Sequence, residues 1–498
     1  MSVFEPDAPP RLSWDMWKRF AIGGILVIML TATAVASAVL LEVHDSIEGF
    51  QQFSTPIPGI KNELDNVDPG GPQTILVLGS DRRWGDKSAG IPARSDTIIV
   101  VRLDPDKEAT AILSIPRDLK VEIPGHGTNK INTAYALGGP KLTVKTVKNL
   151  LNIPISHVVN VNFGGFQRAV NRLGCVYVDI DRRYFNDRGG PGGYATIDLK
   201  PGYQKLCGKD SLDFVRYRHT DDDFVRAARQ QEFLRQAKDQ VGLGKVFGDR
   251  KQLLKIFGQY TQTDIARDND AAILRLIKLA YESSKHPIHE VKFRGGQETP
   301  EYVEISPENL QKTVDEFIDV GLGAALVSRE AADEQRKRKK PKPVKSRKRL
   351  APGLVNREEA GENHVLAIAT RQHTLPIYFP KAIVGSGGYQ KESPRLYDIY
   401  DRAKHKYRAY RIVLSQGENG QYYGVQGMTW KAPPILDNPT DERRFAGRTY
   451  KRYFDGRRIR LIAWETPKAV YWVSNTLSRR LTNRQMMDIA RSLQRIGQ

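Results

Sequence analysis

The chain has 498 residues, of which 40% are hydrophobic and 27% charged, a composition typical of globular proteins with about two or three domains. Its formal net charge is +20, but ten of the fourteen residues at 336–349 are Lys or Arg. Half of the excess charge therefore lies in one short segment. The rest of the chain is only mildly basic, so the overall charge does not by itself indicate nucleic acid binding.

An uncharged, apolar segment over residues 20–41 predicts a membrane-spanning helix. Its 22 residues would extend about 33 Å as a helix, enough to cross a hydrocarbon core of about 30 Å. Basic residues precede the segment and acidic residues follow it, so the positive-inside rule places residues 1–19 in the cytoplasm. We therefore expect a single-pass protein of the cell membrane with the bulk of the chain outside. A cleaved signal peptide is the alternative, although the apolar run continues beyond the small-residue sites.

A polar stalk at 42–72 leads into a region, 73–326, in which strand-like and helix-like patterns alternate. The strand-like runs are continuously apolar, as in strands buried on both faces. They lie at 74–78, 97–103 and 109–115, and a further strand-like segment lies at 176–180. Helical patterns lie at 142–151, 166–173, 223–241, 250–284 and 307–320. This alternation predicts an α/β domain with three layers, α/β/α.

The remainder of the chain is expected to form a linker and a second domain. Residues 327–352 read as an exposed linker, either a solvated spacer or a segment that docks on an anionic lipid or wall polymer surface. Residues 353–498 predict a small α+β domain. Its alternating strands are expected at 365–369, 410–415, 421–426, 458–464 and 469–473, before a final helix capped by Thr482. Because its sequence shows no acidic pair, nucleophile or metal cluster, we interpret it as a binding or positioning module.

Cys175 and Cys207 are the two cysteines of the chain. Outside the membrane, such a pair predicts one disulfide that closes a loop of about 30 residues and contributes roughly 3 kcal/mol. Two buried thiols are the alternative. A zinc site is not indicated, because no matched histidines accompany the pair.

Several catalytic signatures are missing from the sequence: a P-loop, a GxSxG elbow, an HExxH motif and a dinucleotide-binding glycine fingerprint. What remains is a set of charged residues at predicted strand ends. Asp81 and Asp96 flank two apolar strands, where open α/β sheets bind ligands. Two carboxylates with substrate oxygens suit Mg²⁺. Loop capping by each aspartate separately is the alternative interpretation.

Basic and amide side chains accompany these aspartates. Arg216 and Arg218 are two residues apart, so in an extended segment they share a face, and Arg226 and Gln230 share a helix face. Arginine binds phosphate oxygens in a bidentate fork, so the set predicts a site for a pyrophosphate and its metal. Surface salt bridges are the alternative. The residues of this set are Arg94, Arg117, Arg216, Arg218, Arg226 and Gln230.

The chain resembles the LytR-CpsA-Psr family from residue 73 to about 325. The resemblance rests on six motifs in order: ILVLGSD, ARSDTIIVVRLD, ILSIPRDL, KINTAYALGG, FGGFQRAVNRLGCVYVDI and FVRYRHTDDDFVRAARQQEFL. It implies an enzyme that takes a wall glycopolymer from a polyprenyl-pyrophosphate carrier. The polymer would be joined to a primary hydroxyl of peptidoglycan through a phosphodiester bond.

The resemblance also implies roles for individual residues. Asp81 and Asp96 would hold Mg²⁺ on the pyrophosphate, and either could serve as the catalytic base. Lys130 lies in a further family motif and would join the pyrophosphate site. The residues that would hold the pyrophosphate oxygens are Arg94, Arg117, Arg216, Arg218, Arg226 and Gln230.

Two other functions fit the same residues. Water as acceptor would make the protein a polyprenyl-pyrophosphate pyrophosphatase. A non-enzymatic protein that binds or regulates the wall would depend mainly on the basic linker and the C-terminal domain. Nucleic acid is not expected as a partner, because the topology places the basic segment outside the membrane.

Overall fold

The computed structural model describes most of the chain from residue 51 onward, including part of the predicted stalk, where Ile57 and Ile60 belong to the core. The described residues are 48, 51–68, 71–80, 95–107, 110–187, 196–217, 223–241, 248–265, 270–284, 286, 288–291, 293, 297–319, 350–371, 374–418 and 420–497. The predicted membrane segment at 20–41 and the basic tract at 336–349 lie outside these ranges. Within them, no helix combines the length and apolar character that crossing a membrane requires.

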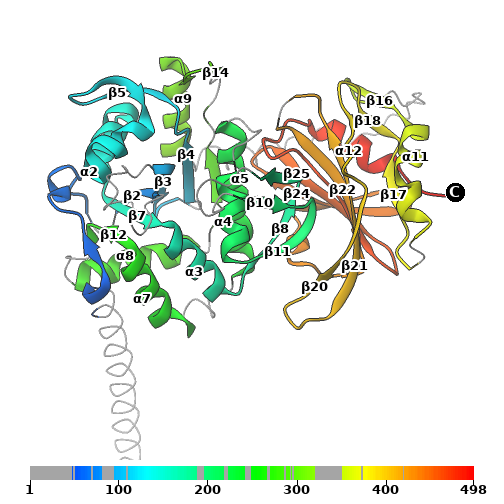
Figure 1. Ribbon diagram of the computed structural model, residues 1–498, viewed down its shortest axis with the longest axis horizontal. Helices are drawn as coiled ribbons and strands as arrows, with labels where there is room; N and C mark the ends of the chain where they lie inside the picture. The colour runs from blue at the N-terminus through cyan, green and yellow to red at the C-terminus, as the bar shows by residue number, and fades with distance from the viewer. Residues whose placement is uncertain are drawn as a thin grey trace, which may run out of the picture.

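A seven-stranded mixed sheet forms the centre of the first region (Figure 1). Its strands, in spatial order, are β1 (Thr55–Pro56), β12 (Thr261–Thr263), β7 (His157–Asn162), β2 (Gln73–Ser80), β3 (Ser95–Leu103), β4 (Thr110–Ile115) and β13 (Ile288–Val291). β2 runs parallel to β7 and antiparallel to β3, and β4 runs antiparallel to β3. All six residues of β4 are buried, as its continuous apolar run predicts.

Helices cover both faces of this sheet. On one face, α2 (Ile131–Leu151) and α9 (Pro307–Ile318) pack on a core that includes Val158 of β7. On the other, α7 (Arg250–Tyr260) and α8 (Asp270–Ser284) pack around Val159, the next residue of the same strand. The prediction of a mixed α/β domain is therefore confirmed.

The helical stretch predicted at 250–284 was wrong in its middle. Thr261–Thr263 forms β12, which pairs with β7 and separates α7 from α8. Thr263 Oγ1 donates a hydrogen bond to the Val158 carbonyl oxygen at 2.8 Å. The pairing with β7 stabilises the extended backbone here, and the β-branched threonines suit it.

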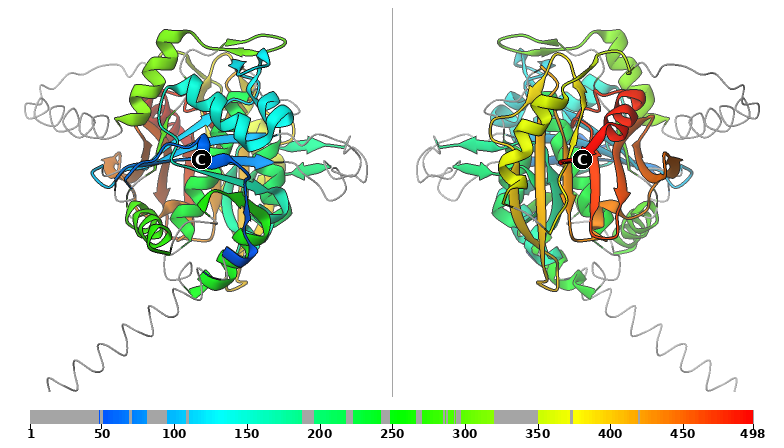
Figure 2. Two further views of the ribbon diagram at one scale, coloured as in Figure 1. Left: turned by 90° about the vertical axis from the view of Figure 1, so that its left-hand side faces the viewer. Right: turned by 90° about the vertical axis from the view of Figure 1, so that its right-hand side faces the viewer.

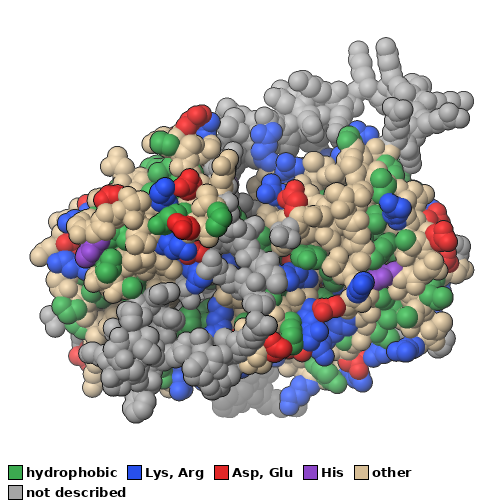
Figure 3. Space-filling view, turned by 45° about the horizontal axis from the view of Figure 1, so that its top comes forward, with side chains coloured by type: hydrophobic (Ala, Val, Ile, Leu, Met, Phe, Trp, Pro, Cys, Tyr) green, Lys and Arg blue, Asp and Glu red, His purple; other side chains and the backbone are tan. Residues whose placement is uncertain are grey.

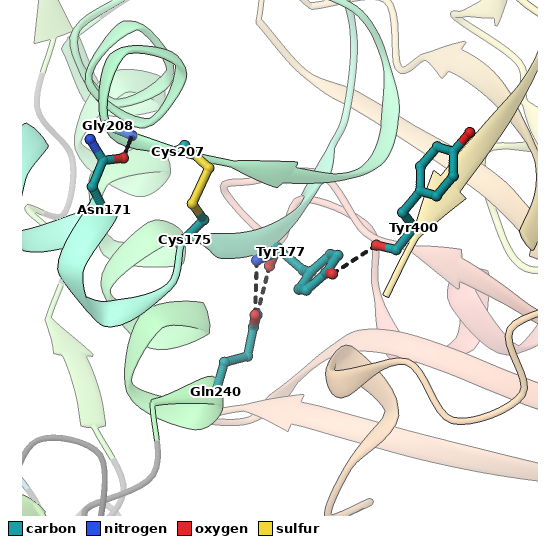
Figure 4. The surroundings of a disulfide bond; sticks show 7 residues. All are labelled: Asn171, Cys175, Tyr177, Cys207, Gly208, Gln240 and Tyr400. Carbon is teal, nitrogen blue, oxygen red and sulfur yellow. Dashed lines mark hydrogen bonds between the residues drawn. A yellow bond between two sulfur atoms is a disulfide. The ribbon is translucent and has the colours of Figure 1, made fainter. Parts of the chain in front are cut away.

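A second layer of elements connects the central sheet to the C-terminal region. In chain order they are α3 (Phe163–Leu173), β8 (Val176–Ile180), β9 (Tyr184–Asn186), β10 (Ile197–Leu199), β11 (Gly202–Leu206), α4 (Gly208–Arg216) and α5 (Asp223–Gln240). β8 and β11 pair antiparallel, with Val176 opposite Leu206. The Cys175–Cys207 disulfide joins the adjacent ends of these strands, with a Cα–Cα distance of 4.5 Å (Figure 4). The predicted disulfide is confirmed.

The C-terminal region contains an antiparallel eight-stranded sheet. Its strands are β19 (Gly388–Tyr389), β20 (Arg395–Tyr400), β21 (Lys406–Ser415), β22 (Tyr422–Met428), β26 (Val470–Ser474), β25 (Arg458–Glu465), β24 (Arg448–Asp455) and β23 (Asp441–Phe445). The strand expected at 421–426 is confirmed as β22, which pairs antiparallel with β21. So is the final helix, α12 (Asn483–Arg491), which Thr482 caps by accepting from Gln485 N.

The strand predicted at 365–369 was wrong, because these residues end helix α11 (Glu358–Ala369). Two glutamates occupy its first turn, where they complement the helix dipole. Val365 and Ile368 are three residues apart and both buried, which is helical spacing. α11 and α12 pack on the same face of the eight-stranded sheet (Figure 2).

The opposite face of that sheet packs on the β8–β11 pair. Tyr177 of β8 and Tyr203 of β11 share one hydrophobic core with Tyr397 and Trp472 of the C-terminal sheet. Tyr203 and Trp472 meet edge to face, with ring centroids 5.6 Å apart. The two regions are thus joined by a buried aromatic interface.

Candidate functional site

One edge of the central sheet brings together the strand ends that carry the predicted site residues. Ser80, the last residue of β2, pairs with Ser95 at the start of β3 and with Asn162 at the end of β7. Ile115, the last residue of β4, pairs with Ile98 of β3. The ends of β2, β4 and β7 therefore meet the beginning of β3 at a single edge.

The backbone of Asp96 lies at a bulge on this edge. Gly79 pairs with Thr97 and Ser80 with Ser95, so Asp96 is the extra residue between them. Bulges of this kind occur frequently beside active sites. The side chain of Asp96 and the whole of Asp81, Arg94 and Arg218 lie outside the described residues, so their assignment to the site stays a prediction.

Arg117 and Lys130 lie on either side of a buried carboxylate that the sequence analysis did not identify. Arg117 follows β4 by two residues, and its Nε lies 3.8 Å from Asp118 Oδ2. Lys130 Nζ lies 3.5 Å from Asp118 Oδ1. A hairpin of β5 (Lys120–Ile123) and β6 (Gly127–Lys130) brings Lys130 back to this point. The position of Asp118 next to Arg117 in the SIPRD string was the available signal.

Gln230 links the site strand to the helix that carries Arg216. Its Nε2 donates to Thr97 Oγ1 at 3.1 Å and to the Val215 carbonyl oxygen at 3.2 Å. Thr97 directly follows Asp96, and Val215 directly precedes Arg216. Arg216 ends α4, where its Nη2 lies 2.9 Å from Asp213 Oδ1. The predicted residues Arg216 and Gln230 thus lie together beside β3.

Arg226 lies one helical turn before Gln230 on α5 and is buried. Arg229 on the same helix is fully buried and was missed by the sequence analysis. Its Nη1 donates to the carbonyl oxygens of Phe214 at 3.0 Å and Tyr217 at 2.7 Å. Arg229 therefore caps the C-terminal end of α4 and fixes the backbone on both sides of Arg216. Sequence spacing does not distinguish a buried capping arginine from one that binds phosphate.

Most of the described side chains of the site are basic, and they have little exposure to solvent. Exposed Lys and Arg side chains lie on both halves of the molecule (Figure 3), so surface charge does not single out this edge. What distinguishes Arg117, Arg216 and Arg226 is their low exposure at converging strand and helix ends. Cations held with little exposure interact strongly with a polyanion, since the local dielectric constant is lower than in water.

The described residues contain no group of three or more His, Cys, Asp or Glu that could hold a metal ion. The predicted magnesium ligands are not covered by that finding, because the side chains of Asp81 and Asp96 are not described. Their chemistry fits Mg²⁺, which prefers oxygen ligands and commonly takes one or two carboxylates plus substrate oxygens.

Comparisons with known proteins agree with the motifs. Residues 32–320, more than half of the chain, match the model of the LytR_cpsA_psr family. The chain is 30% identical over 307 residues to the polyisoprenyl-teichoic acid–peptidoglycan teichoic acid transferase TagU of Oceanobacillus iheyensis, covering 58% of this chain and 88% of that protein. It is 32% identical over 220 residues to TagT of Bacillus subtilis, covering 44% of this chain and 68% of that protein.

A solved structure is similar as well. The crystal structure of B. subtilis TagT aligns with 53% of this chain and 97% of its own, at 27% sequence identity and a TM-score of 0.40. The family match ends at residue 320, before the eight-stranded sheet begins. On the match of the family model, this chain belongs to the LytR_cpsA_psr family.

Proposed function

We propose that this protein transfers a glycopolymer from a polyprenyl-pyrophosphate carrier to peptidoglycan, forming a phosphodiester bond. The observation that supports the proposal is the position of Gln230, which bonds to Thr97 near the start of β3 and to Val215 beside Arg216, while Arg117 follows the adjacent end of β4 by two residues. Relatives about one third identical are named as transferases of teichoic acid from a polyisoprenyl carrier to peptidoglycan, which supports it.

The reaction requires charge stabilisation more than covalent chemistry from the protein. A sugar hydroxyl of peptidoglycan attacks the phosphorus that bears the glycopolymer. The bond from that phosphorus to the bridging oxygen breaks, and polyprenyl phosphate leaves with the electron pair. Arg117, Arg216 and Arg226 bind the pyrophosphate oxygens in the ground state and in the transition state, where negative charge shifts towards the leaving phosphate. Lys130 adds a further positive charge beside Arg117.

The proton of the attacking hydroxyl needs an acceptor. We assign this role to Asp81 or Asp96, the two carboxylates that the sequence places at the ends of β2 and β3. The same residues would hold Mg²⁺, which when bound neutralises charge on the pyrophosphate. Arg117 is a catalytic residue in this proposal, because it contacts the reacting phosphates.

We further propose that residues 20–41 anchor the protein in the cell membrane, with residues 1–19 in the cytoplasm and the site outside. The length and apolar character of the segment and the flanking charges support this topology. A membrane anchor would hold the site close to a lipid-linked substrate, raising its local concentration.

The test separates transfer from hydrolysis and from a non-enzymatic role. Full-length protein in detergent is incubated with Mg²⁺ and a polyprenyl-pyrophosphate-linked oligosaccharide, with and without peptidoglycan fragments. We expect a phosphodiester-linked product by mass spectrometry only when the fragments are present, and none from the Asp81→Ala variant. Release of phosphorylated oligosaccharide without an acceptor would indicate a pyrophosphatase instead. Absence of both products from the wild-type protein would contradict an enzymatic function.

A further inference from the structure

Helix α5 connects the candidate site to the C-terminal region. Gln230 on this helix bonds to β3 beside Asp96. Two residues later, Glu232 is buried and pairs with residues of the C-terminal region. The contacts that fix this helix therefore decide where two predicted phosphate ligands, Arg226 and Gln230, are placed.

A buried ionic cluster surrounds Glu232. Arg479 Nη2 and Arg235 Nη1 each lie 2.6 Å from Glu232 Oε2, and Arg460 Nη1 lies 3.7 Å from Oε1. Asp455 Oδ2 accepts from Arg479 Nε at 3.1 Å and from Arg235 Nη2 at 3.2 Å. Three of these residues, Arg460, Arg479 and Asp455, come from the C-terminal region.

The cluster also reaches the central sheet. Arg235 pairs with Glu290 of β13, so one arginine contacts α5, the edge strand and the C-terminal region. In these ion pairs three arginines face the carboxylates of Glu232, Glu290 and Asp455. Burial by itself raises the pKa of Glu232, but the guanidinium groups of Arg235, Arg479 and Arg460 outweigh it and hold that pKa below its usual value. Glu232 thus stays ionised, and removal of one arginine leaves a buried charge undercompensated.

Further contacts hold α5 in place at its beginning and at its end. Leu477, two residues before Arg479, packs against Val225 and Ala228 of α5. Val225 directly precedes Arg226, and Ala228 follows it by two residues. At the far end, the Gln240 side chain bonds to both the backbone nitrogen and oxygen of Tyr177, at 2.8 and 2.6 Å (Figure 4). α5 is therefore held at its beginning, middle and end.

We propose that the C-terminal domain positions α5 for the reaction, and that Arg479 is a positioning residue whose ion pairs keep Arg226 and Gln230 aligned with β3. The segment of Leu477 and Arg479 contacts α5 on both sides of Gln230 in the sequence. A displacement of about 1 Å in such ligands can slow a reaction about a hundredfold. This inference rests on the proposed function, because it assigns a role to a second domain in the same phosphate site.

The test compares Arg479→Gln with Arg480→Gln in the full-length protein. Arg480 is the next residue, but it is 58% exposed and lies 3.9 Å from an equally exposed Glu418. Binding of geranylgeranyl pyrophosphate is measured by calorimetry, transfer by kcat and KM, and the order of α5 by hydrogen exchange. We expect Arg479→Gln to weaken binding and lower kcat/KM on the order of tenfold to a hundredfold. Exchange should accelerate in α5 but not in β2 or α2, and Arg479→Lys should recover part of the loss.

Arg480→Gln should match the wild type in every measurement. Wild-type binding and kinetics in Arg479→Gln would overturn the inference. If that variant does not fold, Leu477→Ala replaces it with the same expectation, and wild-type affinity there would equally overturn the inference. A wild-type protein that does not bind geranylgeranyl pyrophosphate would contradict the proposed function instead, so the two failures are distinguishable.

Discussion

The two sheets of this protein use buried charge in different ways. In the seven-stranded sheet, charged and polar groups lie where strands end: Arg117 and Lys130 flank Asp118 after β4, and Gln230 bonds to Thr97 near the start of β3. In the eight-stranded sheet, buried polar groups lie in the middle of strands and face the other region. Arg411 of β21 and Trp472 of β26 both contact Asp179 of β8.

The first arrangement is that of a ligand site, and the second is that of an interface between two regions. Groups at strand ends can contact a ligand, whereas groups in mid-strand are covered by whatever packs on the sheet. The C-terminal sheet is covered by α11 and α12 on one face and by β8 and β11 on the other. Its central residues therefore hold the molecule together, and their charges are matched by carboxylates across the interface.

The largest effect is expected at the strand ends. Arg117→Ala or Arg216→Ala should abolish transfer, because each removes a donor to the pyrophosphate. The fold should survive, because each buried carboxylate still has a cationic partner. Asp118 retains its ion pair with Lys130, and Asp213 retains its ion pair with Lys209, whose Nζ lies 2.5 Å from Asp213 Oδ2. Product formation and the thermal midpoint measure the two effects. Transfer at the wild-type rate by both variants would rule out the site.

At the interface between the two regions, we expect substitutions to lower stability and not to remove the transfer activity. Arg411 is fully buried and its Nη1 lies 3.0 Å from Asp179 Oδ1. Arg411→Met would leave that carboxylate undercompensated and should lower the free energy of unfolding by about 3–5 kcal/mol. The control is Arg408→Met on the same strand, which removes a partly exposed pair with Asp398 and should cost less than about 1 kcal/mol. Equal costs in denaturant titrations would contradict the division.

The disulfide tests the layer between the two sheets. Cys175 and Cys207 are 32 residues apart, so in a chain-entropy model their bond stabilises the fold by about 3 kcal/mol. The Cys175→Ser/Cys207→Ser double variant should unfold at correspondingly lower denaturant concentration. Dithiothreitol should reproduce that shift in the wild type and leave the variant unchanged. An unshifted variant would mean that the β8–β11 pairing holds without its covalent link.

The smallest effect is expected at helix α11, which covers one face of the C-terminal sheet. Burial lowers the pKa of His364 on α11 from 6.5 to about 4. The unfolded chain therefore binds this proton more readily, and the folded state loses stability as the pH falls from about 6.5 to about 4. His364→Gln should flatten the decline of the thermal midpoint across that window. An unchanged slope in His364→Gln would contradict the assignment.

Much of the first region was predictable because its signals are local. Continuous apolar runs indicated β2, β3 and β4, and the motifs indicated which residues follow them. The wrong predictions concern segments whose conformation depends on contacts with other elements of the fold. β12 is extended because β7 pairs with it, and the residues at 365–369 are helical, with Val365 and Ile368 buried in the core and Leu366 exposed. Alternation read from a five-residue window does not separate these cases.

The sequence by itself determined the family and the order of the site motifs, since both follow from residue type and spacing along the chain, and it predicted the disulfide that the structure confirms. Only the tertiary structure decided which charged residues serve the fold. Arg229, Glu232 and Arg411 look like ordinary surface charges in the sequence, yet they are buried and paired across segments far apart. Burial is a property of the assembled elements, and the cost of an unpaired buried charge makes those distant pairings necessary.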